Sequence, residues 1–186
     1  RHRGISNSQE LRRRISAWFR SKTIVLGEEP GDTPRHHIAM YMTPLQRGTM
    51  LVGSPQLARQ IVAEDYLPGE RSTETDEPLR PDFSDEMQAR FDRAATELKA
   101  LGYRVERIPN LPFDHKTYYS YTNGVFEERG NQRIAYMPVY GHDALDRAAR
   151  QVYENLGWTV NPIRVRKLYK YHGTIGCLVN ITQRSK

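Results

Sequence analysis

The sequence predicts an α/β fold, and three observations lead to that prediction. Residues 85–101 and 143–156 carry apolar side chains at helical spacing, and a glycine follows each of them directly. Short runs with alternating apolar and polar residues come next, as expected for strands. This helix–glycine–strand order repeats, because residues 97–109 resemble residues 153–163 and Gly102 aligns with Gly157. We therefore expect one α/β domain of repeated units.

The first third of the chain is expected to begin with a helix and continue with short strands. Ser8 can cap a helix over residues 8–19, whose apolar residues recur at helical spacing. Residues 23–26 (Thr-Ile-Val-Leu) have the composition of a short buried strand. Further elements are expected as follows: strands at 37–45 and 49–52, a tight turn at 46–48, and a helix at 55–63 with proline in its first turn.

Residues 64–84 differ in composition from the rest of the chain. They are rich in Glu, Asp, Pro, Ser and Thr and nearly free of apolar residues, which predicts a long surface loop. The elements expected after it are a helix at 85–101, strands at 103–108, 118–125 and 133–137, a helix at 143–156, and strands at 158–163 and 175–181.

The opening segment follows the same order as the two repeats, so we count three units, the last of them cut short. In each unit the strand after the loop begins at a comparable place. These places hold His37, residues 119–123 and Cys177. If rotation relates the units, the three segments converge on one axis, and that axis is where we expect the functional site.

Charge and cysteine content exclude several classes of function. The net charge of +6 is spread along the chain, with small basic clusters at 12–14 and 164–170 and no zinc-finger spacing, so nucleic-acid binding is not expected. No apolar run approaches the roughly 18 residues of a membrane span. The single cysteine excludes an intramolecular disulfide and a cysteine-rich zinc site, and we expect neither metal nor cofactor. A free thiol favours the reducing cytoplasm.

Cys177 is the first candidate for chemistry. Gly173 and Gly176 leave backbone uncovered beside its sulfur, which allows a ligand to approach closely. The alternative is a buried cysteine that acts as a small hydrophobe. As a nucleophile, the thiolate would need a base or cation nearby.

His37 is the preferred partner for Cys177. A strand at this place puts His37, Ala39 and Tyr41 on one face, which would be turned to the axis, and the apolar residues between them on the other. His36 would then face away from the axis.

Three further residues are candidates for substrate binding. Asn123 precedes Gly124, so it either forms a turn or directs its amide to a polar group of the substrate. Arg35, and similarly Arg129, could hold a substrate carboxylate.

The motif His37-Ile-Ala-Met, together with Gly173-Thr-Ile-Gly-Cys-Leu-Val-Asn180, resembles the guanidine-modifying superfamily, also called penteins. That superfamily includes arginine and agmatine deiminases, dimethylarginine hydrolases and amidinotransferases. The resemblance covers most of the chain, because residues 49–53, 123–124 and 137–141 also match its layout in the same order.

The resemblance implies a pentein-type αβ propeller of ββαβ-like units, of which about three of five would be visible. It implies a cysteine nucleophile, Cys177, that attacks a guanidinium carbon while His37 handles protons, with Gly176 and Asn123 beside the substrate. Two carboxylates would bind the guanidinium nitrogens. Residues 1–186 would be the C-terminal portion of a single catalytic domain, and an N-terminal remainder, separate or cleaved, would be a partner.

Ala39 departs from the family pattern, which has Asp or Glu two residues after the histidine. A methyl group cannot bind a guanidinium. The chain could be a natural non-catalyst, another acid could substitute, or the residue could have been altered to inactivate an enzyme, which the otherwise intact motif favours. We therefore expect a deiminase-type hydrolase, weakened or inactive. The alternatives are an amidinotransferase and a non-catalytic binding pentein.

Overall fold

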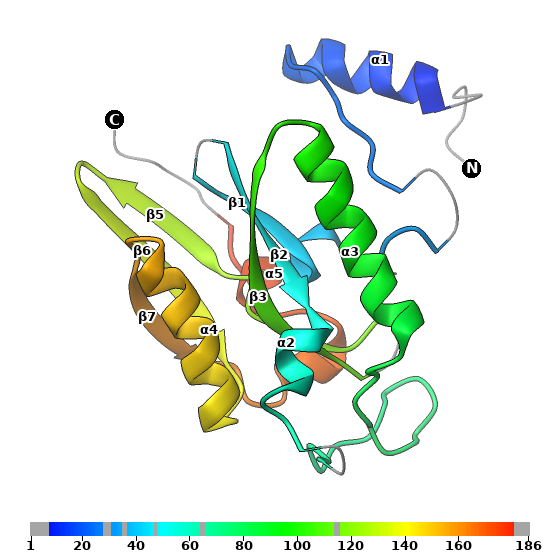
Figure 1. Cartoon of the computed structure of the whole chain (residues 1–186), viewed down its shortest axis with the longest axis vertical. Helices are drawn as coiled ribbons and strands as arrows, with labels where there is room; N and C mark the ends of the chain where they lie inside the picture. The colour runs from blue at the N-terminus through cyan, green and yellow to red at the C-terminus, as the bar shows by residue number, and fades with distance from the viewer. Residues whose placement is uncertain are drawn as a thin grey trace.

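A computed structural model describes residues 8–27, 31–34, 37–46, 48–63, 66–113 and 116–180 (Figure 1). The helices are α1 (Ser8–Phe19), α2 (Pro55–Arg59), α3 (Asp85–Ala100), α4 (Asp143–Asn155) and α5 (Ile175–Leu178), with 3-10 turns η1 (Ile38–Met40) and η2 (Leu168–Tyr171). The strands are β1 (Met42–Gln46), β2 (Thr49–Ser54), β3 (Arg104–Pro112), β4 (Tyr118–Ser120), β5 (Val125–Arg129), β6 (Gln132–Val139) and β7 (Thr159–Arg164). The predicted α/β class is confirmed.

The strands form two sheets that share one connection pattern. In the first sheet the order is β1-β2-β3-β4, and in the second it is β5-β6-β7. Each sheet has an antiparallel hairpin, β1–β2 or β5–β6, whose second strand pairs in parallel with a strand reached through a helix. The described residues thus contain two complete ββαβ units, and not the three that we counted from the sequence.

The two crossover helices end in the same way. The Tyr103 N–H donates to the Leu98 carbonyl at 3.1 Å after α3, and the Trp158 N–H donates to the Tyr153 carbonyl at 3.0 Å after α4. Each of these two turns contains a glycine, Gly102 (φ 87°) or the equivalent Gly157 (φ 80°), because its left-handed backbone suits glycine. The helix–glycine–strand pattern predicted from the repeat is confirmed.

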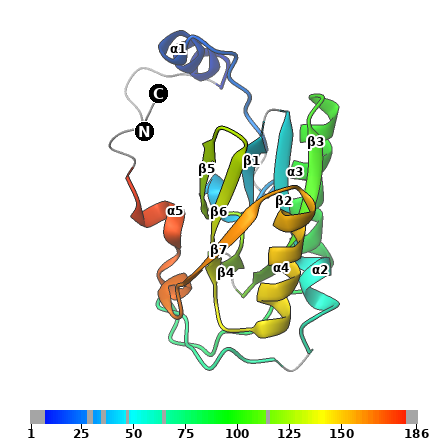
Figure 2. The same cartoon turned by 90° about the vertical axis from the view of Figure 1, so that its left-hand side faces the viewer.

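The sheets lie between two sets of helices. Helices α2, α3 and α4 cover one side, whereas α5 lies on the other (Figure 2). One buried cluster joins residues of both sheets, such as Leu51 and Ile108 from the first and Ala135 and Met137 from the second. A second cluster lies between α3 and the first sheet. No helix in the described ranges is long and apolar enough to span a membrane.

Four expected strands differ from the structure. Residues 23–26 form no strand, because no neighbouring strand pairs with them. The segment 37–45 divides into η1 and β1, since the Met40 N–H bonds to the His37 carbonyl at 2.8 Å and closes a turn. The expected strand at 118–125 stops at Ser120.

The fourth is the expected C-terminal strand at 175–181. Residues 175–178 form the short helix α5, at whose start the Cys177 N–H donates to the Thr174 carbonyl at 3.0 Å; residue 181 lies outside the described ranges. Gly173 before this turn and Gly176 within it lower the tendency of the segment to form a strand.

Candidate active site

Three segments far apart in the sequence meet beside the first sheet. They are residues 39–40 in η1, residues 120–123 after β4, and residues 174–177 at the start of α5. These are the segments that the repeat predicted to converge. Their contacts are hydrogen bonds from uncharged polar side chains, most of them buried.

Polar side chains fix the backbone of η1. Ser120 Oγ donates to the Met40 carbonyl at 2.7 Å, and Asn110 Nδ2 donates to the same oxygen at 3.0 Å. Thr122 Oγ1 donates to the Ala39 carbonyl at 2.8 Å. Because these donors are buried, breaking any of the bonds would leave a polar group without water, so the position of η1 is well determined.

Asn123 joins all three segments. Its side-chain Nδ2 lies 2.8 Å from Met40 Sδ and 3.0 Å from Cys177 Sγ. Its carbonyl accepts bonds from Thr174 Oγ1 at 2.9 Å and from the Gly176 N–H at 3.2 Å. Asn123 is 1% exposed, and its Oδ1 has no hydrogen-bond partner among the described residues.

Cys177 is exposed at the surface of this junction. It is therefore not the buried small hydrophobe of the alternative interpretation. Its sulfur accepts a hydrogen bond from the buried amide of Asn123, while the residue as a whole is exposed.

Gly176 was expected to leave its backbone uncovered for a ligand, but the structure gives another reason for a glycine here. A Cβ at this position would lie 2.2 Å from Asn123 Oδ1 and 3.2 Å from the Gly124 carbonyl oxygen. The space beside Gly176 is thus filled by Asn123. At Gly173, a Cβ would lie 3.3 Å from the Cys177 sulfur.

Ala39 lies in η1 and His37 directly before it, so neither residue is on a strand. The alternation that placed them on a face with Tyr41 is wrong, since the turn leaves Ile38 55% exposed and buries Met40 completely. His37 is exposed at the start of this turn, and Ala39 is half-buried. The hydrogen bond at the Cys177 sulfur comes from Asn123. The predicted pairing of His37 with Cys177 therefore stays a prediction.

The remaining candidates are placed as follows. Arg35 lies outside the described residues, and Arg129 is exposed at the end of β5. Within the described ranges, no carboxylate bonds to Ala39, Met40, Asn123 or Cys177, and no group of three or more His, Cys, Asp or Glu side chains could hold a metal ion.

Tyr140 holds the backbone of Ser120, one of the residues of the site, through two hydrogen bonds. Its hydroxyl accepts from the Ser120 N–H and donates to the Ser120 carbonyl, both at 2.9 Å. Burial raises the pKa of the Tyr140 phenol, and the charges of Asp146 and Cys177 add to this effect. Tyr140 therefore remains a neutral donor.

Sequence reasoning missed most of the residues whose hydrogen bonds build the junction. These are Met40, Asn110, Ser120, Thr122, Tyr140 and Thr174. The available signal was the run of uncharged polar residues at 120–123 beside aromatic residues, which is unusual for a solvated turn.

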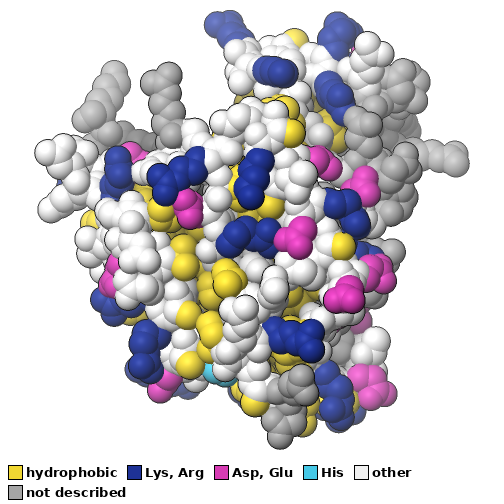
Figure 3. All heavy atoms as spheres, viewed as in Figure 1, with side chains coloured by type: hydrophobic (Ala, Val, Ile, Leu, Met, Phe, Trp, Pro, Cys, Tyr) yellow, Lys and Arg dark blue, Asp and Glu magenta, His cyan; other side chains and the backbone are white. Residues whose placement is uncertain are grey.

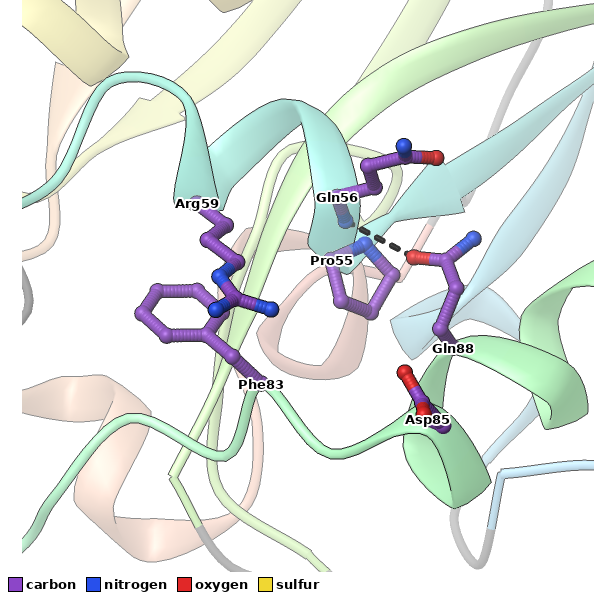
Figure 4. A pocket seen from close by; sticks show the side chains of 6 residues that line it. All are labelled: Pro55, Gln56, Arg59, Phe83, Asp85 and Gln88. Carbon is purple, nitrogen blue, oxygen red and sulfur yellow. Dashed lines mark hydrogen bonds between the residues drawn. The ribbon is translucent and has the colours of Figure 1, made fainter.

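One other pocket of the described residues lies away from this junction. A pocket of about 160 Å³ between α2 and the start of α3 is lined by Arg59, Phe83 and Gln88, and the Gln56 N–H donates to Gln88 Oε1 at 2.7 Å (Figure 4). It contains none of the predicted residues. Figure 3 shows the Lys and Arg side chains of the face around α3 distributed among Asp and Glu, without a single basic patch.

The fold and the meeting of these segments point to one class. The chain has the fold of the guanidine-modifying (pentein) superfamily, to which its structural neighbours belong. This confirms the resemblance predicted from the motifs. No protein-family model and no curated protein matches the sequence.

Three of these neighbours are agmatine deiminases. One is a cysteine-to-serine variant from C. jejuni with substrate bound, at 17% identity and a TM-score of 0.56 over 92% of this chain and 45% of that one. Another is the C. jejuni agmatine deiminase, at 16% identity and a TM-score of 0.57 over 92% of this chain and 46% of that one. A third comes from Enterococcus faecalis, at 14% identity and a TM-score of 0.54 over 92% of this chain and 47% of that one. The chain spans less than half of their length.

Proposed function

We propose that this chain contributes the cysteine side of a guanidine-modifying active site of the deiminase type. The observation that carries the proposal is Cys177 itself, an exposed thiol whose sulfur accepts a hydrogen bond from the buried amide of Asn123. An N–H directed at the sulfur stabilises negative charge there. The substrate-bound neighbour with a cysteine replaced by serine supports a cysteine-centred reaction.

The reaction we propose has two halves. Cys177 Sγ bonds to the guanidinium carbon, and the tetrahedral adduct expels one nitrogen as ammonia, which leaves an amidino-thioether. Water then adds to the same carbon, the C–S bond breaks, and a urea-type product leaves with the sulfur restored. His37 gives a proton to the departing nitrogen and takes one from the attacking water.

Ala39 weakens this activity in our proposal. A guanidinium that enters the site meets a methyl group where the family has a carboxylate. A charge-assisted hydrogen bond contributes about 1.5–3 kcal/mol, so its loss should cost about ten- to a hundredfold in recognition. The donors that hold η1 in place would allow an acid at position 39 to act without rebuilding the site.

The test uses a charged probe and its neutral counterpart. We expect 2-chloroacetamidine to alkylate Cys177, detected by mass spectrometry, and a Cys177→Ser variant to remain unlabelled. In the Ala39→Asp variant, the rate with the amidine relative to neutral 2-chloroacetamide should rise about ten- to a hundredfold. A Cys177 that neither probe labels in folded protein contradicts the nucleophile. An unchanged ratio in Ala39→Asp contradicts the role of position 39.

A non-catalytic binding protein is the second candidate, and Ala39 is the observation that favours it. Such a protein would bind a guanidinium compound without forming the thioether. Binding of arginine or agmatine by calorimetry, without ammonia release in the Ala39→Asp variant, would support it. An amidinotransferase would instead transfer the amidino group from Cys177 to an amine. The product would then depend on which amine, in place of water, attacks the intermediate.

We further propose that residues 1–186 form the C-terminal portion of one catalytic domain. The fold supports this, since the chain matches under half of each deiminase. The carboxylates that the proposed reaction requires would then come from the remainder of the domain.

A further inference from the structure

Residues 70–79 form a closed loop, which we call the strap. The Leu79 N–H donates to the Glu70 carbonyl at 2.9 Å, and the Ser72 N–H donates to the Glu77 carbonyl at 2.8 Å. Leu79 is 3% exposed and belongs to the buried cluster that joins the two sheets. The strap is therefore an ordered element with one end fixed in the core, so that its tip can hold a neighbouring segment in place.

The tip of the strap, at Thr73, bonds to the residues at the end of η2. Thr73 Oγ1 donates to the Lys170 carbonyl at 3.1 Å, and the same oxygen lies 3.4 Å from His172 Nε2. Because the Thr73 hydroxyl hydrogen is directed at Lys170, its oxygen is left to accept from the His172 ring. On the other side of that ring, Nδ1 lies 3.4 Å from Thr117 Oγ1, directly before β4. His172 is thus held between two threonine hydroxyls.

His172 has a backbone conformation that needs such support. Its φ of 63° and ψ of 29° are left-handed, which is unfavourable for a residue with a Cβ atom. Of the four described non-glycine residues with positive φ, three lie in the strap or in the segment 165–172 that it contacts: Asp76, Arg166 and His172. Strain of this kind persists only where the surroundings hold it. We therefore expect His172 to relax when its contact with the strap is lost.

The turn that follows His172 connects it to the candidate active site. Thr174, two residues further on, is fully buried and donates from Oγ1 to the Asn123 carbonyl at 2.9 Å. Gly176 packs so closely on Asn123 that a Cβ would lie 2.2 Å from its Oδ1. The hydrogen bond from Asn123 Nδ2 to Cys177 Sγ, at 3.0 Å, depends on this packing. A shift of the turn would therefore weaken the bond to the sulfur.

We propose that the strap positions Cys177 for reaction, with Thr73 and His172 as its positioning residues. The strap holds His172 in the left-handed conformation, this conformation keeps the turn on Asn123, and the amide then keeps its N–H on the sulfur. Release of the strap removes the donor that stabilises negative charge on that sulfur. This inference rests on the proposed function at Cys177, and it adds a surface loop as the element that regulates the site.

The test removes the Thr73 hydroxyl with little change of shape. In Thr73→Val we expect alkylation of Cys177 by iodoacetamide at neutral pH to slow by about three- to tenfold, the effect of one ordinary hydrogen bond. At alkaline pH, where accessible thiols are ionised, the variant should react as fast as the wild type. Thr73→Ser keeps the hydroxyl and should react as the wild type at both pH values. A purely structural loss would change the rate at both.

Amide hydrogen exchange reports the turn itself, independently of the chemistry. The Gly176 N–H is bonded to the Asn123 carbonyl, and the Cys177 N–H is bonded to the Thr174 carbonyl. In Thr73→Val both should exchange about three- to tenfold faster. Exchange in β2 should keep its wild-type rate, which distinguishes local release of the strap from a loss of global stability.

Two further variants serve as controls. Thr75→Val removes a hydroxyl that accepts from the Glu77 N–H at 3.4 Å within the strap, and it should change neither alkylation nor exchange at the turn. His172→Gly removes the ring together with the strain, because glycine adopts the left-handed backbone freely. In this background Thr73→Val should slow alkylation by less than about twofold.

Two results would overturn the proposal. The first is alkylation and exchange at wild-type rates in folded Thr73→Val. The second is a Thr73→Val effect of full size in the His172→Gly background, because the strap would then not act through His172. If Cys177 is not alkylated even in the wild type, the proposed function fails, whereas exchange at Gly176 and Cys177 still decides whether the strap holds the turn.

Discussion

Asn123 is the residue on which the candidate site depends most. Its amide contacts two sulfurs, Met40 Sδ and Cys177 Sγ, and its carbonyl holds the turn before α5. Because its Nδ2 already bonds to these two sulfurs, Asn123 is better suited to position Cys177 than to bind a substrate. A substrate contact through its unbonded Oδ1 stays a prediction.

Replacing Asn123 by Asp tests this positioning role. The change keeps the shape but replaces an N–H donor to sulfur by a carboxylate that repels a thiolate. We expect alkylation of Cys177 by iodoacetamide to slow by about tenfold, which corresponds to about 1.4 kcal/mol. The buried charge should also lower the free energy of urea unfolding by about 3 kcal/mol.

The control for Asn123→Asp is Asn155→Asp, at the exposed end of α4. It adds the same charge to the protein and should leave the alkylation rate unchanged, while a negative charge at the helix C-terminus should lower the free energy of unfolding by at most about 1 kcal/mol. Alkylation at the wild-type rate in a folded Asn123→Asp variant would show that the amide does not activate the sulfur.

At the scale of elements, the sequence allowed the helices to be predicted better than the site-bearing segments. Helices α3 and α4 have a period of apolar residues and a glycine end, both of which are local signals. The turns at η1 and α5 depend instead on distant partners, such as Ser120 for Met40 and Asn123 for Gly176. Alternation of side chains could not reveal them. The internal repeat did locate the three segments, because they begin at comparable places in its units.

The segment that leads to Cys177 is tied to the loop before α3. Glu70 pairs with Lys167 and, at 3.1 Å, with Lys170, while Thr73 Oγ1 donates to the Lys170 carbonyl at 3.1 Å. His172 Nε2 lies 3.4 Å from the Thr73 hydroxyl. The strand pairing described within residues 66–84 is an isolated bridge between Arg71 and Pro78, so these contacts add to the loop's own backbone hydrogen bonds.

Acid should loosen this loop, and Glu70 sets the pH range. Hydrogen bonds from Lys167 and then Lys170 hold the pKa of Glu70 below its usual value. A lowered pKa in the folded state means that the stabilisation is present above the ordinary carboxyl range and is lost as the pH falls through the lowered value. We expect Glu70→Gln to speed trypsin cleavage after Arg71 at neutral pH, at a cost of up to about 1 kcal/mol.

The matched control for Glu70→Gln is Glu77→Gln, an exposed acid of the same loop. Its cleavage rate should follow the wild type at every pH. If Glu70→Gln and the wild type are cleaved equally at neutral pH, the lysine pairs do not order the loop.

At the scale of the whole molecule, the two ββαβ units fold around shared groups. The Tyr119 and Tyr140 rings stack at 4.4 Å between centroids, and Tyr153 Oη of α4 donates to the Tyr121 carbonyl at 2.7 Å. Strand β4 belongs to the first sheet, whereas Tyr140 follows β6 of the second. The junction that carries Cys177 therefore forms only when both sheets are in place.

Tyr140→Phe tests whether the sheets unfold as one unit. The variant keeps the stacked ring but removes the hydroxyl that both accepts from the Ser120 N–H and donates to its carbonyl. Two buried backbone groups then lack partners, so we expect a loss of about 2–4 kcal/mol in urea unfolding. Fluorescence of buried Trp158, directly before β7 of the second sheet, and hydrogen exchange in β2 of the first should report the same loss. Separate transitions, with β2 as stable as in the wild type, would mean that each unit folds alone and that Tyr140 serves only the second.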